Sequence, residues 1–109
     1  PLPTLTYVAI PDQNFEQKLI DLGYDDVLDG QVLSTNISEL EHLNVSDAEI
    51  ADITGIGGFI NLKSLEIRNN SLTSLDLSKN TALTHLFCSG NKFDCDAMKT
   101  KYNIWYFKH

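Results

Sequence analysis

The chain has 109 residues, 42% of them hydrophobic, and a formal net charge of −7. This composition predicts one folded domain with a modest core rather than a disordered chain. An acidic chain without clustered Lys and Arg is unsuited to nucleic acid, and no apolar run approaches the ~18 residues that a membrane-spanning helix needs. Since the chain begins with Pro1 rather than Met, we expect any signal or anchor segment to lie outside it.

The charge is unevenly divided along the chain. Residues 12–52 carry eleven acidic side chains and one basic one, a net charge of −10, whereas residues 53–109 carry four acidic and seven basic ones, a net charge of +3. Most of these groups are expected to be solvated surface charges. The alternative is weak head-to-tail association between an acidic and a basic end.

The first 39 residues are expected to form an N-terminal cap. A β-rich run over 5–10 is followed by a predicted helix over 12–22, with Asp12 as its N-cap and one apolar stripe of Phe15, Leu19 and Leu22. Such a helix would cover the open end of a repeat array.

The segment 24–38 is acidic and rich in turn-forming residues. Asp25 and Asp29 resemble the start of a calcium loop, but Val27 stands where an oxygen ligand is required and Asn36 where the bidentate Glu belongs. We therefore expect no metal ion here.

Three copies of one spacing, L-x-x-L-x-L-x-x-N-x-L, begin at Leu40, Leu62 and Leu83, 22 and 21 residues apart. This is the pattern of leucine-rich repeats, each a short strand, a corner and a return. It predicts an α/β solenoid with repeats over 40–61, 62–82 and 83–96, a parallel sheet on the concave face, and a C-terminal cap over 97–109. The chain as a whole is expected to be one domain, 1–109.

Asn70 and Asn91 fall at the corner position, where an amide side chain bonds backbone groups that the turn leaves unpaired. We expect them to form a buried ladder, which Ala48 interrupts in the first repeat. A second copy of the spacing, from Leu72 to Asn80, is out of phase and fails in the neighbouring repeats. A degenerate fourth repeat around Leu19 is an alternative to the predicted helix, which the capping signals favour.

The returns differ from repeat to repeat. Residues 51–61, with three glycines, predict a loose helical turn, whereas 72–82 predict an extended return. Beyond the third repeat we expect a short helix over 94–101 and a closing strand over 102–107. Three consecutive aromatic residues would form a hydrophobic lid: Trp105, Tyr106 and Phe107.

The two cysteines are Cys88 and Cys95. Cys88 shares the inner column of the strands with Val45 and Ile67, so we expect a free, buried thiol that packs as a small hydrophobe. A disulfide is the alternative, and it would have to draw Cys88 out of this column or bring Cys95 into it.

The repeats resemble those of bacterial surface and secreted proteins. The turn formed by Ile50, Asp52, Ile53, Gly55 and Ile56 is similar to the internalin type, and the S-K-N-T-A-L-T run over 78–84 to the 21-residue repeats common in Bacteroidetes. The leader over 11–25 resembles the N-terminal cap of those proteins. The resemblance covers about 10–96, and it implies secretion or surface display and recognition through the concave face.

Alternation along the strands places every second side chain on the face away from the core. The residues expected to bind a partner are His42, Asn44, Ser64, Glu66, Arg68, His85 and Phe87. Phe87 would either anchor a partner or be covered by the C-terminal cap.

Catalytic and metal chemistry is not expected. His42 and His85, two strands apart, would be roughly 10 Å from each other, too far to share a zinc ion. His85 and Cys88 would point to opposite faces, so they cannot form a dyad. No cofactor is expected.

The leading hypothesis is therefore a non-catalytic module that recognises a protein or a glycan. The alternative is a structural or accessory domain acting by end-on self- or hetero-assembly, and an enzyme ranks third.

Overall fold

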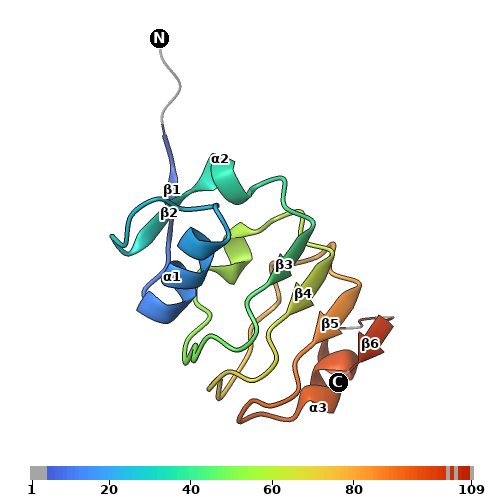
Figure 1. Cartoon of the computed structure of the whole chain (residues 1–109). Coiled ribbons are helices and arrows are strands. Elements are labelled where there is room, and N and C mark those ends of the chain that lie inside the picture. Colours follow the sequence, from blue (N-terminus) through green and yellow to red (C-terminus); the bar gives the residue numbers. More distant parts are fainter. Residues whose placement is uncertain (1–4, 103, 105, 109) are drawn as a thin grey trace.

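The computed structural model of this chain describes residues 5–102, 104 and 106–108, the side chains of Lys99 and of 106–108 excepted. The described part contains two sheets, which Figure 1 shows with the helices that flank them. In chain order the elements are β1 (Tyr7–Ala9), α1 (Gln13–Asp21), β2 (Gln31–Leu33), α2 (Ser34–Ile37), β3 (His42–Asn44), the 3₁₀ turn η1 (Ile56–Gly58), β4 (Ser64–Glu66), β5 (His85–Phe87), α3 (Cys95–Lys101) and β6 (Tyr106–Lys108).

The larger sheet contains the strands of the three repeats. β3, β4 and β5 pair in parallel and place Leu43, Leu65 and Leu86 opposite one another, and β6 extends the sheet beyond β5. This register joins residues 22 and 21 positions apart, the offsets of the frame that begins at Leu40. The predicted repeat frame and the solenoid of parallel strands are confirmed.

The core lies between this sheet and the returns of the repeats. Leu43, Leu65 and Leu86 point inward and are at most 1% exposed. Leu72 and Leu77, from the out-of-phase copy of the pattern, are buried as well. That second copy therefore has a structural role, because it supplies the opposite wall of the same core.

Asn70 and Asn91 form the predicted ladder at the corners, although only Asn70 is buried and Asn91 is half-buried. The Oδ1 atom of Asn70 accepts hydrogen bonds from the backbone N–H groups of Ala48 and Ile50, each at 3.0 Å. One repeat later the Oδ1 atom of Asn91 accepts from the N–H group of Leu72 at 3.1 Å. Each rung thus satisfies backbone groups of the preceding repeat, which would otherwise remain unpaired inside the fold.

The residue before each ladder position has a left-handed backbone. Asp47, Asn69 and Gly90 have φ angles of 57°, 57° and 78°. Asp and Asn tolerate this region better than other non-glycine residues. At Gly90 a Cβ atom would overlap the side chain of Asn69, so glycine is needed there for space as well as for conformation.

Helix α1 begins where the sequence predicts it. The Oδ1 atom of Asp12 accepts hydrogen bonds from the N–H groups of Asn14 and Phe15, which is N-cap geometry. Its Oδ2 atom accepts from the N–H groups of Ala51 and Asp52, both at 2.9 Å. One carboxylate therefore caps the helix and ties it to the first repeat.

The apolar side of α1 packs on the first repeat. Phe15 and Leu19 are fully buried, and the ring of Phe15 stacks on that of Phe59 with the centroids 6.1 Å apart. Leu22, which the predicted stripe includes, is 40% exposed, because it lies at the C-cap where the chain turns away from the core. The alternative of a degenerate fourth repeat in this segment is wrong, since the residues form a helix.

Asp12→Ala is expected to lower the free energy of unfolding by about 1 to 3 kcal/mol, because it removes the helix cap and leaves the two N–H groups of the first repeat without their acceptor. Urea unfolding followed by circular dichroism measures the loss. Asp26→Ala, which removes an exposed carboxylate from the following loop, is the control. Equal midpoints for the two variants would contradict the dual role of Asp12.

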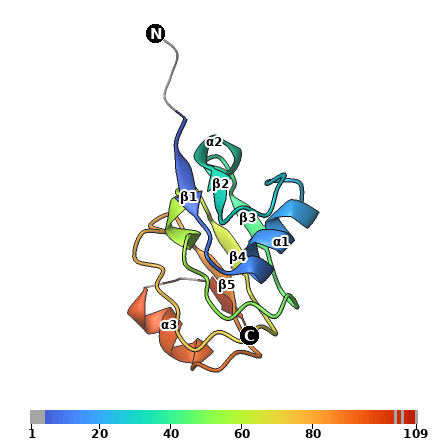
Figure 2. The same ribbon diagram turned by 90° about the vertical axis from the view of Figure 1, so that its left-hand side faces the viewer.

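The segment 24–38 contains regular secondary structure, which its many turn-forming residues did not lead us to expect. It contains β2 and the single-turn helix α2, and β2 pairs with β1 in an antiparallel sheet that places Tyr7 opposite Leu33. Figures 1 and 2 show this small sheet beside α2, at the N-terminal end of the repeats. The elements escape sequence patterns because three or four residues are too few to display a period.

The short helix predicted in the C-terminal segment is present, whereas the closing strand is shifted. Helix α3 spans Cys95–Lys101 with Asp94 as its N-cap, and the hydroxyl of Tyr102 donates to the carbonyl of Leu75 at 2.9 Å. The closing strand is β6, which begins later than expected. The side chains of the predicted aromatic lid lie outside the described residues.

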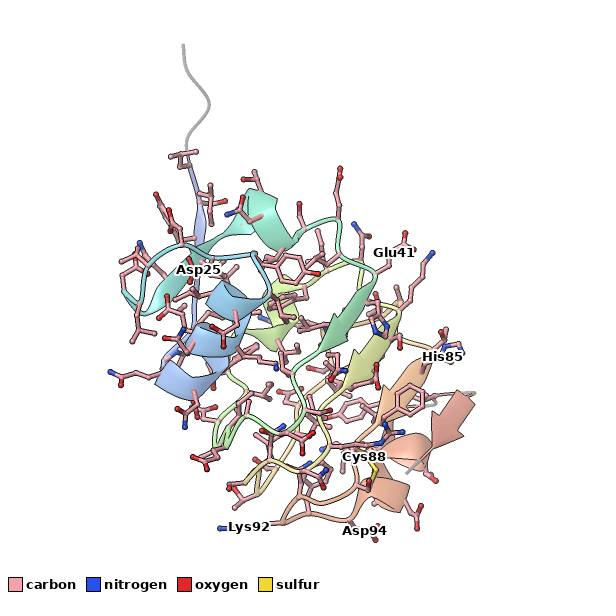
Figure 3. The ribbon with its side chains drawn as sticks, in the orientation of Figure 1. Asp25, Glu41, His85, Cys88, Lys92 and Asp94 are labelled. Atoms are coloured by element: carbon pink, nitrogen blue, oxygen red, sulfur yellow. A yellow bond between two sulfur atoms is a disulfide. The ribbon has the colours of Figure 1, made fainter. Side chains whose placement is uncertain are left out.

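The prediction of a free Cys88 thiol is wrong. Cys88 and Cys95 form a disulfide, with their Cα atoms 5.6 Å apart. Cys88 keeps its place in the inner column with Val45 and Ile67, and the start of α3 brings Cys95 to it, so that the two cysteines are 0% and 7% exposed. Figure 3 shows the Cys88 sulfur beside α3.

Candidate functional site

The face of β3, β4 and β5 that points away from the core carries three short rows of side chains. We call it the outer sheet face and define it by nine residues. The strand register aligns His42, Ser64 and His85 in the first row and Asn44, Glu66 and Phe87 in the second, and Ser46, Arg68 and Ser89 follow the strands in the third. The seven residues predicted to bind a partner therefore lie on one continuous surface. In Figure 3, His85 projects from β5 on this face, and Asp25 lies on the far side of the molecule.

The third row continues the pairing of the strands. The N–H group of Asp47 donates to the carbonyl of Arg68 at 3.0 Å, and the N–H group of Arg68 donates to the hydroxyl of Ser46, also at 3.0 Å. The N–H group of Asn69 bonds the carbonyl of Ser89 at 2.9 Å. These bonds fix the backbone just beyond β4. The side chain of Arg68 therefore extends from a backbone position that is held in place.

A row of side-chain contacts crosses three strands on this face. The Nε2 atom of His42 lies 3.1 Å from the Oε2 atom of Glu66, and the Oε1 atom of Glu66 lies 3.5 Å from the Nη1 atom of Arg68. The guanidinium of Arg68 in turn lies over the ring of Phe87, 4.7 Å from its centroid. Four of the predicted residues are thus linked into one network.

These contacts orient side chains more than they stabilise the fold. His42 is 61% exposed and Arg68 is 32% exposed, and exposed ion pairs are typically worth less than about 1 kcal/mol. A cation over an aromatic ring at an exposed site adds about 0.5 to 1 kcal/mol. The network is therefore better suited to presenting groups to a partner than to holding the protein together.

The remaining predicted residues offer hydrogen-bonding groups. Asn44 is exposed, and its Oδ1 atom accepts from the N–H group of Ser46 at 3.1 Å. The Nδ1 atom of His85 lies 2.8 Å from the hydroxyl of Thr84, which holds the imidazole ring. Cys88 is buried and disulfide-bonded beneath this face, so the structure provides no thiolate for a nucleophile.

Three carboxylates gather on the other side of the molecule. Oxygen atoms of Glu16, Asp25 and Asp29 lie within 4.8 Å of one another. Glu16 is only 1% exposed, and its carboxylate accepts hydrogen bonds from the N–H groups of Asp29 and Gly30 at 3.2 and 2.8 Å. Its observed role is to anchor the loop that leads into β2.

A hollow of about 580 Å³ also lies away from the outer sheet face, between β1, the return of the first repeat and the outward side chains of the second return. Its two carboxylates accept hydrogen bonds from backbone groups two residues further along the chain. Asp52 accepts from the N–H group of Thr54, and Asp76 accepts from that of Ser78. Hydrogen bonds from Ser78, with the charge of the nearby Lys101 and Lys79, lower the pKa of Asp76. These contacts explain both carboxylates as parts of tight turns, so the chemistry favours the outer sheet face as the site.

Comparison with family models and with curated proteins finds no match. Solved structures, however, do match. The chain is similar to the functional domain of InlJ from Listeria monocytogenes, with a TM-score of 0.78 and 26% identity over 100% of this chain. It is also similar to two other internalins of that organism: InlF, with a TM-score of 0.76 and 24% identity over 91% of the chain, and InlC2, with a TM-score of 0.67 and 25% identity over 76%. The chain has an internalin-like leucine-rich repeat fold.

The internalin-like chain is short beside these structures. It spans 25%, 30% and 37% of the InlJ, InlF and InlC2 chains. The InlJ domain is described as including a cysteine ladder, whereas here the inner column carries Val45 and Ile67 before Cys88. Among the described residues, every helix is too short or too polar to cross a membrane.

Proposed function

We propose that this internalin-like chain is a non-catalytic recognition module that binds a protein through its outer sheet face, the concave face of the solenoid. The observation that carries the proposal is the network from His42 through Glu66 and Arg68 to Phe87, which crosses three strands. Recognition surfaces gain from side chains that are oriented before binding, since less conformational freedom is then lost. Arg and aromatic residues are also the types that dominate binding energy at interfaces.

We further propose that the module belongs to a secreted or surface-displayed bacterial protein. Two observations support this location. The fold is similar to that of the Listeria internalins, and the chain contains a disulfide. Disulfides persist in oxidising surroundings outside the cytosol.

Replacing Glu66 by Gln, Arg68 by Gln and Phe87 by Ala together is expected to abolish partner capture in pull-down assays while leaving the melting temperature nearly unchanged. The three side chains are half-buried on the sheet surface and lie outside the buried core cluster, so the fold depends little on them. The matched control replaces Asp26 by Asn, Lys79 by Gln and Leu28 by Ala, three exposed residues away from the outer sheet face. Both triple variants keep the net charge of the chain.

If the variant at Glu66, Arg68 and Phe87 captures the partner as well as the wild type does, the proposal is wrong. The second candidate, end-on assembly, rests on the opposite charges of the N-terminal and C-terminal parts of the chain. It demands salt-sensitive self-association in sedimentation experiments, and the same triple variant would retain that association.

A further inference from the structure

We propose that the partner presents an acidic polypeptide segment, one carboxylate of which binds the guanidinium of Arg68. This inference rests on the proposed function, because it names the chemistry that the outer sheet face recognises. It follows from the position of Arg68, from the distribution of charge and from the covering of the Phe87 ring.

Arg68 is held in place by groups on two neighbouring strands. Its guanidinium lies 4.7 Å from the centroid of the Phe87 ring, and its Nη1 atom lies 3.5 Å from Glu66. The arginine side chain is 32% exposed and that of Glu66 is 21% exposed, so the cation is the more accessible of the two. A planar guanidinium fixed in this way is matched to a carboxylate, which it binds through parallel N–H groups.

The charge of this face differs from that of the rest of the chain. The net charge is −7, yet Glu66 is the only carboxylate among the nine residues of the outer sheet face. One of its oxygen atoms lies 3.5 Å from the Nη1 atom of Arg68, so that its charge is balanced within the face, and the other lies 3.1 Å from the Nε2 atom of His42. The nine residues therefore carry no net charge, whereas residues 12–52 as a whole carry −10, so an acidic segment is repelled less at this face than at the other surfaces of the N-terminal part, and Arg68 is the cation that it meets here. Such a contrast favours one docking position over others.

The same geometry argues against a sugar as the principal ligand. A pyranose ring usually binds by stacking on an open aromatic face, and Phe87 is the one Phe, Tyr or Trp residue that the segments of β3, β4 and β5 contribute to the outer sheet face. Arg68 lies over one face of that ring. The group presented at this point is thus a cation, and the neighbouring hydroxyl and amide groups of Ser46 and Asn44 suit the backbone of a peptide.

The test is a titration of the isotopically labelled protein, monitored by NMR, with a blocked pentaglutamate peptide at millimolar concentration. We expect saturable shifts of the Arg68 side-chain Nε–Hε signal and of backbone amides in β4 and β5, which weaken as salt is raised. A pentaglutamine peptide should produce no such shifts. Glucuronic acid, which carries a carboxylate on a sugar, should produce weaker shifts than pentaglutamate.

Two substitutions sharpen the result. Arg68→Gln is expected to weaken pentaglutamate binding roughly tenfold or more, since one charge-assisted pair is lost. Lys63 directly precedes β4 and forms an exposed ion pair with Glu41. Lys63→Gln removes this cation and should change pentaglutamate binding by no more than about twofold, because exposed charges contribute little to binding energy.

Several results would overturn the inference: no saturable shifts with pentaglutamate, equal shifts with pentaglutamine, stronger binding of glucuronic acid, or unchanged binding by Arg68→Gln. Its failure is distinguishable from failure of the proposed function. If partner capture is lost in the triple variant but survives Arg68→Gln alone, the recognition face stands and the acidic partner does not. If capture also survives the triple variant, the recognition face itself is wrong.

Discussion

Leu65→Ala is expected to lower the free energy of unfolding by about 2 to 5 kcal/mol. Leu65 is 0% exposed at the centre of β4, and it stacks between Leu43 and Leu86 of the adjacent repeats. Truncation removes apolar contacts on both sides and leaves a cavity that the stacked strands cannot close. Since small domains are stable by only ~5 to 15 kcal/mol, the loss is a large share of the total.

The matched control is Leu5→Ala, which makes the same chemical change at a side chain that is 59% exposed. Paired urea melts should place the midpoint of Leu65→Ala clearly below that of Leu5→Ala, with similar slopes. Equal midpoints would be incompatible with the stacking of the three repeats described above.

Removing the disulfide is expected to cost about 2 to 4 kcal/mol, towards the lower end because the closed loop is short. The bond joins Cys88, immediately after β5, to Cys95, at the start of α3, across a loop that contains the ladder residue Asn91. We expect a lower melting temperature in dithiothreitol, with faster amide hydrogen exchange in α3 than in β3 and β4. The local effect follows because the bond anchors α3 directly to the last repeat.

Two variants separate the bond from the packing of Cys88. Cys95→Ala leaves a buried thiol in the inner column, and it should match the reduced protein in stability. Cys88→Val with Cys95→Ala gives the third repeat the side chain that Val45 provides in the first, and it should recover part of the loss. Dithiothreitol should affect neither variant. A Cys95→Ala protein as stable as the oxidised wild type would restore the interpretation of Cys88 as a simple core residue.

The repeat frame was predictable because leucines at fixed spacing have one arrangement that buries them all. The pairing of Leu43, Leu65 and Leu86 follows from that spacing alone. Helix α1 was predictable because Asp12 supplies a start signal that acts locally. The outer sheet face was predictable for a similar reason, since strand alternation decides which side chains leave the core.

Contacts that depend on the direction of a side chain could not be predicted from the sequence. Glu16 reaches the N–H groups of Asp29 and Gly30 only because the loop after α1 folds back. Cys95 reaches Cys88 only because α3 begins immediately beyond the corner. The contact of Arg68 with Phe87 likewise depends on rotamers across two strands, which no spacing along the chain specifies.

Each carboxylate oxygen of Asp12 accepts two hydrogen bonds, and these bonds decide which fragments of the chain can fold. The cap and the first repeat are adjacent segments of sequence, but this carboxylate belongs to both, since it serves the start of α1 and the N–H groups of Ala51 and Asp52 at once. A peptide ending at residue 39 would have a capped helix without the surface that buries Phe15. A peptide beginning at Leu40 would expose Phe59, which that ring covers. The smallest piece able to fold on its own therefore includes both segments, and a transplanted cap would have to bring the first repeat with it.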